Sequence, residues 1–424
     1  MTHTFRDAHL HLYAHGEQVT CVPLADCASL DDCLERLARR AEQVGPGEWV
    51  RAAGARVEAW PERRFPTARE IDKAVGARPA FVRSFDLHAC ALSGELLSRT
   101  GITRDTPDPE GGRILRDDRA EPTGVLLENA AFLVRPAIPT PSPAELKEAV
   151  RAALRDLLAH NIVETHDMHA QEWLGPTLAA LIDEGDHAAS TMTFRLYAPL
   201  TDLRRAHDDA PNWTRDNLTL AGGKVFLDGT LNSRTAYLLE PFADPLPGLP
   251  RGERLYTNAA LDDAIRLADS LRLPLAMHAI GDAAVRYGLD ALERTSPRTR
   301  GFRIEHAQFV HERDVPRFTR LNVIASPQPC HLLCDVEALR RLTPHLIPRA
   351  FPIRDLLQAE AEAGRAPGET VWFGSDTPVV SPAPADNLQA AVHRARRNAP
   401  TSSAISPEQS ITTEQFLACS RPAR

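Results

Sequence analysis

Histidine and carboxylate side chains recur at the ends of short apolar segments in this sequence. The first segment carries His9 and His11 at alternate positions, shortly after Asp7. Alternate residues of a strand point to one face, so both imidazoles can reach a common point. Later segments end in further ionisable residues, which are Lys224, His278, His306 and Asp376. Imidazole and carboxylate donors together suit zinc, manganese or iron, so the joint pattern predicts a metal centre.

Each of these residues alone also has a structural explanation. An HxH pair is usually solvated, His278 could be a hydrogen-bonded core histidine, and Asp376 could cap a helix. Lys224 could form an ion pair with Asp228 or Asp376. Alternatively, a crowded cationic site lowers the pKa of Lys224, and the neutral amine takes up carbon dioxide to give a carbamate that bridges two metal ions.

Eight apolar segments, bounded by Gly, Pro or Asp, are expected to be buried strands. They cover residues 4–12, 161–167, 191–198, 218–228, 273–282, 302–308, 322–329 and 370–376. Helical patterns separate them, and the clearest begins with the capping box of Ser142 and Glu145. Strands alternating with helices predict an α/β fold, a (β/α)8 TIM-like barrel. The carboxyl ends of its strands converge on one face, where the active site of this fold lies.

The long interval between the first two strands predicts a large insertion. It contains two further strand patterns, at residues 49–53 and 79–85, and a run rich in Pro and Gly. We therefore divide the chain into three parts. Residues 1–45 supply the first barrel strand and its helix, residues 46–140 form an inserted cap over the barrel mouth, and residues 141–424 form the remainder of the barrel.

The composition excludes several classes of protein. The 424 residues are 43% hydrophobic and 25% charged, which excludes collagen, coiled coils and a largely disordered chain. A formal net charge of −8 argues against a general nucleic-acid binder. No apolar stretch approaches the roughly 18 residues of a membrane span, and no secretory signal is visible. The seven cysteines form no CxxC pair, so we expect reduced thiols in a cytoplasmic protein.

The remaining histidines are weaker candidates. His88, in the predicted cap, and His166, in the second strand, are expected to face the pocket. The others stand next to charged or turn residues and are expected at the surface: His15, His160, His187, His207 and His393.

Six strings of the sequence resemble the amidohydrolase superfamily, specifically its amidohydrolase-3 branch. They are DAHLHL (7–12), GGKVFLDGTLNSRTA (222–236), HAIGDAAV (278–285), RIEHAQ (303–308), ASPQP (325–329) and GSDTPV (374–379). Any one string would be a weak signal, but in this order they are specific, and the resemblance covers nearly the whole chain.

The resemblance implies two divalent metal ions, zinc being the expected metal, although one ion is an alternative. The first ion would be held by His9, His11 and Asp376. The second would be held by His278 and His306, with a carboxylated Lys224 between the two ions. It is the resemblance that favours the carbamate over an ion pair.

Other roles follow from the same resemblance. Asp376 would be the proton shuttle, and Asp7 would orient an imidazole of the first strand. His88 and Arg234 are candidate substrate-binding residues. Relatives carry further segments around the barrel that build a small β-sandwich, which is expected here to be missing or vestigial. The barrel flank would then be exposed, and a homodimer could cover it.

The implied activity is hydrolysis of a C–N bond in a small molecule, such as an amide, a formamide or a cyclic amide. A mononuclear deaminase of the same superfamily is an alternative, and it needs no carbamate. A decayed barrel that binds a ligand or partner is a second alternative. The sequence lacks the GxSxG, HExxH and Walker motifs, so serine hydrolase, zincin protease and NTPase functions have no support.

Overall fold

The computed structural model describes residues 3–45, 47–84, 89–109, 112–138 and 140–423. The chain forms two compact units. The first consists of Met1–His15 and Ala153–Arg424, and the second consists of Gly16–Ala152. These boundaries differ from the division at residues 45/46 and 140/141 drawn from the sequence, because residues 16–45 and 141–152 group with the second unit.

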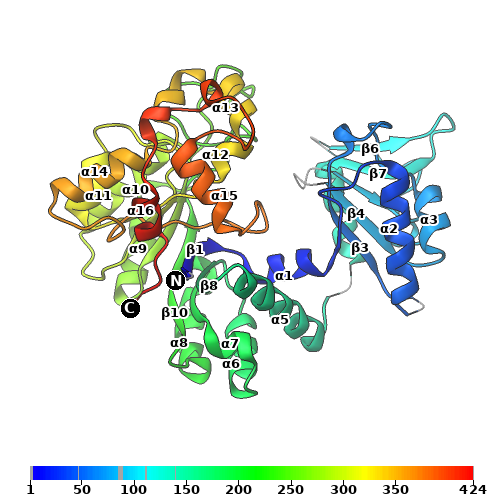
Figure 1. Ribbon diagram of the computed structural model, residues 1–424, viewed down its shortest axis with the longest axis horizontal. Helices are drawn as coiled ribbons and strands as arrows, with labels where there is room; N and C mark the ends of the chain where they lie inside the picture. Colours follow the sequence, from blue (N-terminus) through cyan, green and yellow to red (C-terminus); the bar gives the residue numbers. More distant parts are fainter. Residues whose placement is uncertain (1–2, 46, 85–88, 110–111, 139, 424) are drawn as a thin grey trace. The chain divides into compact units, whose positions relative to one another are not determined.

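Seven parallel strands form the sheet of the first unit, in the order β1-β8-β9-β10-β11-β12-β13. They are β1 (Phe5–Leu10), β8 (Ile162–Met168), β9 (Thr193–Pro199), β10 (Leu218–Phe226), β11 (Leu275–Ala279), β12 (Arg303–His306) and β13 (Ile324–Ser326). Each lies within a segment predicted as a strand or overlaps it closely. Figure 1 shows β1, in blue, beside β8, in green, which is far away in the sequence.

The eighth predicted strand, residues 370–376, is not a regular strand but joins the two edges of this sheet. Val371 forms a single parallel bridge with Ala325 of β13. The N–H of Ala8 in β1 donates a hydrogen bond to the carbonyl of Phe373 at 3.0 Å. The sheet is therefore a nearly closed, TIM-like parallel barrel.

Helices follow the barrel strands along the chain and bury their apolar stripes. The main ones are α5 (Pro143–Ala159), α6 (Leu174–Asp183), α8 (Leu203–Trp213), α9 (Asn258–Ser270), α10 (Asp282–Thr295), α11 (Val315–Leu321), α14 (Ile353–Glu362) and α16 (Thr413–Cys419). In α9 the buried face is the stripe Leu261, Ala264, Ile265 and Ala268, as its 3.6-residue period predicts. Within the described ranges, no helix has both the length and the apolar character needed to cross a membrane.

The second unit is a six-stranded mixed sheet with helices packed on it. Its strands, in sheet order, are β2 (Val22–Pro23), β3 (Val50–Ala55), β4 (Ala80–Ser84), β5 (Ala89–Leu92), β7 (Pro122–Glu128) and β6 (Gly112–Arg116). Two helices, α2 (Leu30–Gln43) and α3 (Ala68–Val75), lie side by side and share a core with this sheet (Figure 1). Two of these strands, β3 and β4, correspond to the patterns at residues 49–53 and 79–85.

Candidate metal centre

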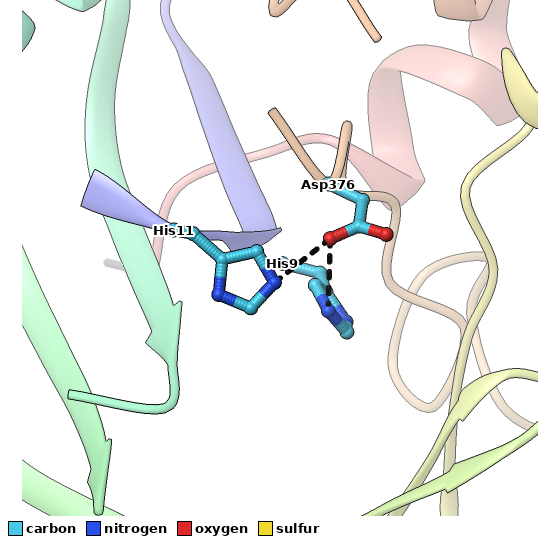
Figure 2. Close-up of side chains that lie close together, drawn as sticks. All are labelled: His9, His11 and Asp376. Carbon is cyan, nitrogen blue, oxygen red and sulfur yellow. Dashed lines mark ion pairs between the residues drawn. The ribbon is translucent and has the colours of Figure 1, made fainter. Parts of the chain in front are cut away.

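Three side chains from opposite ends of the sequence meet at the carboxyl end of the barrel strands. His9 lies in β1, His11 follows that strand, and Asp376 ends the segment that closes the barrel. The Nε2 atoms of His9 and His11 lie 3.4 and 3.0 Å from Oδ1 of Asp376. Figure 2 shows both rings pointing toward this carboxylate. The three side chains are close enough to hold one metal ion.

The backbone around Asp376 is fixed by contacts with β1. Its N–H donates a hydrogen bond to the carbonyl of His9 at 2.6 Å, and its φ of 64° is in the left-handed region. The buried carboxylate of Asp7 accepts hydrogen bonds from the N–H and hydroxyl of Ser375 at 2.9 and 2.6 Å. Asp7 therefore holds the turn that carries Asp376, whereas it was expected to orient an imidazole.

The carboxylate that orients the His9 ring is Glu305 of β12. His9 Nδ1 lies 2.6 Å from Oε2 of Glu305. A carboxylate only accepts hydrogen bonds, so Nδ1 carries the proton and Nε2 keeps a lone pair directed at the Asp376 side. Glu305 in turn forms a fully buried ion pair with Arg303, which also donates to the carbonyl of Ala8 at 2.6 Å.

Sequence reasoning missed Glu305 and Arg303, although a signal was present. In a buried strand, charged residues at alternate positions point to one face and need partners there. Arg303 and Glu305 stand in that relation within β12, and both are 0% exposed.

A second group of donors lies beside the first. His306 ends β12, and its ring centroid is 4.8 Å from that of His9 and 4.4 Å from that of His278. His306, His331 and Asp376 are also close enough to hold a metal ion. His331 begins α12 (His331–Cys334), shortly after β13. It was not predicted, although it follows an apolar segment in the same way as the other candidates.

The two other predicted ligands are buried nearby. His278 Nε2 lies 3.1 Å from the carbonyl of Gly229, so this nitrogen donates and Nδ1 keeps the lone pair. Lys224 lies in β10, with Nζ 5.1 Å from the centre of the Phe226 ring. Burial lowers the pKa of Lys224 to about 8, which makes the neutral amine accessible. Neither Lys224 nor His278 belongs to the His9–His11–Asp376 group or to the His306–His331–Asp376 group.

The electrostatics of the cluster favour a bound cation. Burial lowers the pKa of His9 and of His306 well below the usual value, so both rings are neutral donors. Burial raises the pKa of Asp376, but the nearby His9 and His11 outweigh it and hold that pKa well below its usual range. Its Oδ1 is buried, and its nearest partners are the Nε2 atoms of His11 and His9, at 3.0 and 3.4 Å. Neutral His9 and His306 rings and an ionised carboxylate are protonation states in which these groups bind a metal. Burial lowers the pKa of His11, but the hydrogen bond and the charge of Asp376 outweigh it and raise that pKa, so a cation bound here would displace a proton from His11.

The remaining candidates have mixed outcomes. The guanidinium of Arg234 contacts the carboxylate of Asp244 at 3.3 Å. His88 lies outside the described residues. His166 is buried and uses both ring nitrogens, toward Glu164 and Arg303, both at 2.9 Å.

The expectation of a surface position for His15 is wrong. This side chain is 3% exposed, and it lies 3.0 Å from both Asp156 and the hydroxyl of Thr377. The charged residue that suggested a surface position, Glu17, is partly exposed, whereas the side chain of His15 is turned inward.

Comparisons with known proteins identify the family of this chain. The amidohydrolase family matches residues 4–422. The chain is 29% identical to the Bacillus subtilis protein YtcJ, an amidohydrolase by name, over 92% of this chain and 72% of that protein. It is 27% identical to N-substituted formamide deformylase of Arthrobacter pascens, over 97% of this chain and 76% of the deformylase. A crystal structure of a metal-dependent hydrolase from Pyrococcus furiosus matches with a TM-score of 0.75 and 25% identity, covering 98% of this chain and 80% of the other.

Proposed function

This chain belongs to the amidohydrolase family, and on that premise we propose that it hydrolyses a C–N bond of a small molecule such as an amide, a formamide or a cyclic amide. The observation that carries the proposal is the meeting of His9, His11 and Asp376 around one point at the barrel mouth. A relative named as a formamide deformylase supports the choice of bond. The donors suit zinc, manganese or iron.

In this proposal each residue has a defined task. His9 and His11 hold a cation through their Nε2 atoms, and Glu305 keeps the His9 ring in the required tautomer. A divalent cation held there would lower the pKa of water toward about 7 and would polarise a carbonyl oxygen. Asp376 takes the proton from the attacking water and returns it to the leaving nitrogen, which lets the C–N bond break.

A metal-dependent screen for amine release tests this function. The protein is stripped with a chelator, reloaded with zinc, manganese or iron, and assayed on formamides, acyclic amides and cyclic amides. We expect amine release only after reloading. Asp376→Asn, assayed at saturating metal, should lose roughly 100-fold or more in turnover, because the proton shuttle is gone. Asp263→Asn, at an exposed position 74% accessible, is the matched control and should keep the wild-type rate.

Two results would contradict the proposal. One is a metal-loaded protein that releases no amine from any of these substrates. The other is a wild-type rate in the Asp376→Asn variant. Release of ammonia from an aromatic or cyclic amidine instead would favour the mononuclear deaminase.

A further inference from the structure

The backbone of His169 is strained where the chain leaves β8. Its φ is 122°, whereas every other described non-glycine residue with a positive φ lies between 41° and 68°. Glycine adopts a φ of this size readily, but a side chain makes it costly. The N–H groups of His169 and Ala170 fix this conformation, because both donate to the carbonyl of Tyr197, at 3.0 and 2.9 Å. Strain of this kind persists mainly at functional sites.

The ring of His169 is half-buried, and it has no hydrogen-bond partner among the described residues. Burial, together with the nearby His11 and Lys224, lowers the pKa of His169, so its ring is neutral near pH 7. A neutral imidazole carries one N–H donor and one acceptor nitrogen. His169 therefore has both kinds of hydrogen bond to offer, beside the candidate metal centre.

Phe226 supplies an exposed aromatic ring next to His169. It ends β10, it is 39% exposed, and its ring centroid lies 6.0 Å from that of His169 in an edge-to-face arrangement. The Phe226 centroid also lies 5.2 Å from that of His278, whose ring is 4.4 Å from that of His306. Successive rings therefore connect His169 and Phe226 to the imidazoles around Asp376. An apolar surface with a few convergent polar groups is typical of a ligand-binding site.

We propose that His169 and Phe226 bind the substrate, and that Phe226 selects amides with an apolar alkyl substituent. This inference rests on the proposed function and names the substrate class of its site. The Phe226 ring packs against the alkyl group, while His169 forms a hydrogen bond with the amide. Neither residue was among the substrate-binding candidates drawn from the sequence.

Affinity for amide analogues that are not hydrolysed tests the role of Phe226. N-butylmethanesulfonamide and N-methylmethanesulfonamide are titrated into the zinc-reloaded protein by calorimetry. We expect the wild type to bind the butyl compound roughly tenfold or more tightly, because its added methylenes gain apolar contact. Phe226→Ala should lose most of this preference, and Phe226→Leu should keep it. Phe132→Ala, at a 51% exposed phenylalanine of the second unit, is the matched control and should keep the preference as well.

A change to glycine separates a binding role of His169 from a structural one. Glycine removes the ring and relieves the backbone, so His169→Gly should unfold at the wild-type temperature or above it. It should nevertheless bind both analogues roughly 3- to 10-fold more weakly, because a hydrogen bond is lost. Arg272→Gly, at an exposed residue with a φ of 58°, is the matched control. It should keep its unfolding temperature and bind both analogues as the wild type does.

The outcomes separate this inference from the proposed function. Equal affinity of the wild type for the two analogues, or no binding of either, overturns the inference. An unchanged preference in Phe226→Ala, wild-type affinity in His169→Gly, or a lower unfolding temperature in His169→Gly also overturns it. If Phe226→Ala is poorly folded by circular dichroism, Phe226→Ser is measured in its place, with the same expectation. A protein with the expected affinities that hydrolyses no C–N bond contradicts only the proposed function.

Discussion

At the residue scale, the hydrogen-bond partner of one nitrogen in a histidine ring determines whether the other nitrogen keeps a lone pair for a metal ion. His9 donates from Nδ1 to Glu305, and His278 donates from Nε2 to the carbonyl of Gly229. Each ring therefore keeps a lone pair on its second nitrogen, provided that it is neutral. Burial lowers the pKa of His278 to about 4, so this ring is neutral near pH 7. His9 and His278 are thus prepared as donors before any cation is bound.

Glu305→Gln tests the residue that sets the tautomer of His9. We expect a 10–100-fold loss in affinity for the first metal ion, since the amide can turn its NH2 group toward Nδ1. We also expect a loss of about 3–5 kcal/mol in stability, because the buried Arg303 loses its counterion. Chelator competition and denaturant unfolding measure the two effects. Glu337→Gln removes an exposed partner of Arg396 and should change stability by less than about 1 kcal/mol. Equal effects in the two variants would contradict this account.

Strand-end histidines could be found from the sequence, but their partners could not. His9, His11 and Asp376 are marked by residue type and by their place after apolar segments. Glu305 was hidden within a strand pattern, since only the three-dimensional fold brings it to His9. His331 was passed over because it begins α12 and does not stand at the end of β13 itself. His15 was misplaced because local polarity does not show which face of a helix turns inward.

At the element scale, the segment of residues 370–376 brings Asp376 to the two histidines of the first strand region. It replaces an eighth strand by one bridge and a few hydrogen bonds, and it approaches β1 closely. A Cβ added at Gly374 would lie 2.4 Å from the backbone nitrogen of His9. Its apolar character predicted a strand, whereas this close packing and the left-handed backbone at Asp376 interrupt the regular ladder.

His15 connects this segment to α5. It lies 3.0 Å from both Thr377 and Asp156, so His15→Ala leaves a buried hydroxyl without its partner. A loss of about 1–3 kcal/mol corresponds to roughly 5- to 150-fold faster exchange of the amide hydrogens near Asp376. Hydrogen exchange of peptides over residues 370–380 measures this. His160→Ala is the control, since its half-exposed ring is 3.7 Å from the same Asp156 carboxylate. Equal exchange in both variants would remove the positioning role of His15.

Residues 16–45 belong to the second unit, although their amphipathic pattern does not show which sheet they pack against. The stripe of Leu30, Cys33 and Leu37 in α2 predicts a helix with one buried face. It does not say which sheet covers that face. The partner is the sheet of the second unit, whose β2 has only two residues and gives almost no signal in the sequence.

At the scale of the whole molecule, the described candidate ligands all belong to one of the two units. His9, His11, His306, His331 and Asp376 lie within Met1–His15 and Ala153–Arg424. Metal binding should therefore stabilise this unit directly. The described residues within 16–152 supply no member of either group of donors.

Removal of the metal should therefore speed amide hydrogen exchange in the first unit and leave exchange in the second unit unchanged. A ligand at 100 times its Kd stabilises the folded state by about 2.7 kcal/mol, or roughly 100-fold in amide exchange. On chelation we expect faster exchange in β1, in β12 and over residues 370–376. Peptides covering β3, β4 and β7 should not change. Hydrogen exchange with mass spectrometry gives both results, and an equal change in the two units would contradict the assignment of the site.

Anomalous X-ray diffraction at the zinc absorption edge, on crystals of the reloaded protein, tests the central claim most directly. We predict a peak about 2.0–2.2 Å from Nε2 of His9, Nε2 of His11 and a carboxylate oxygen of Asp376. Fully reloaded crystals with no peak among these side chains, or with zinc only at the surface, would contradict the account.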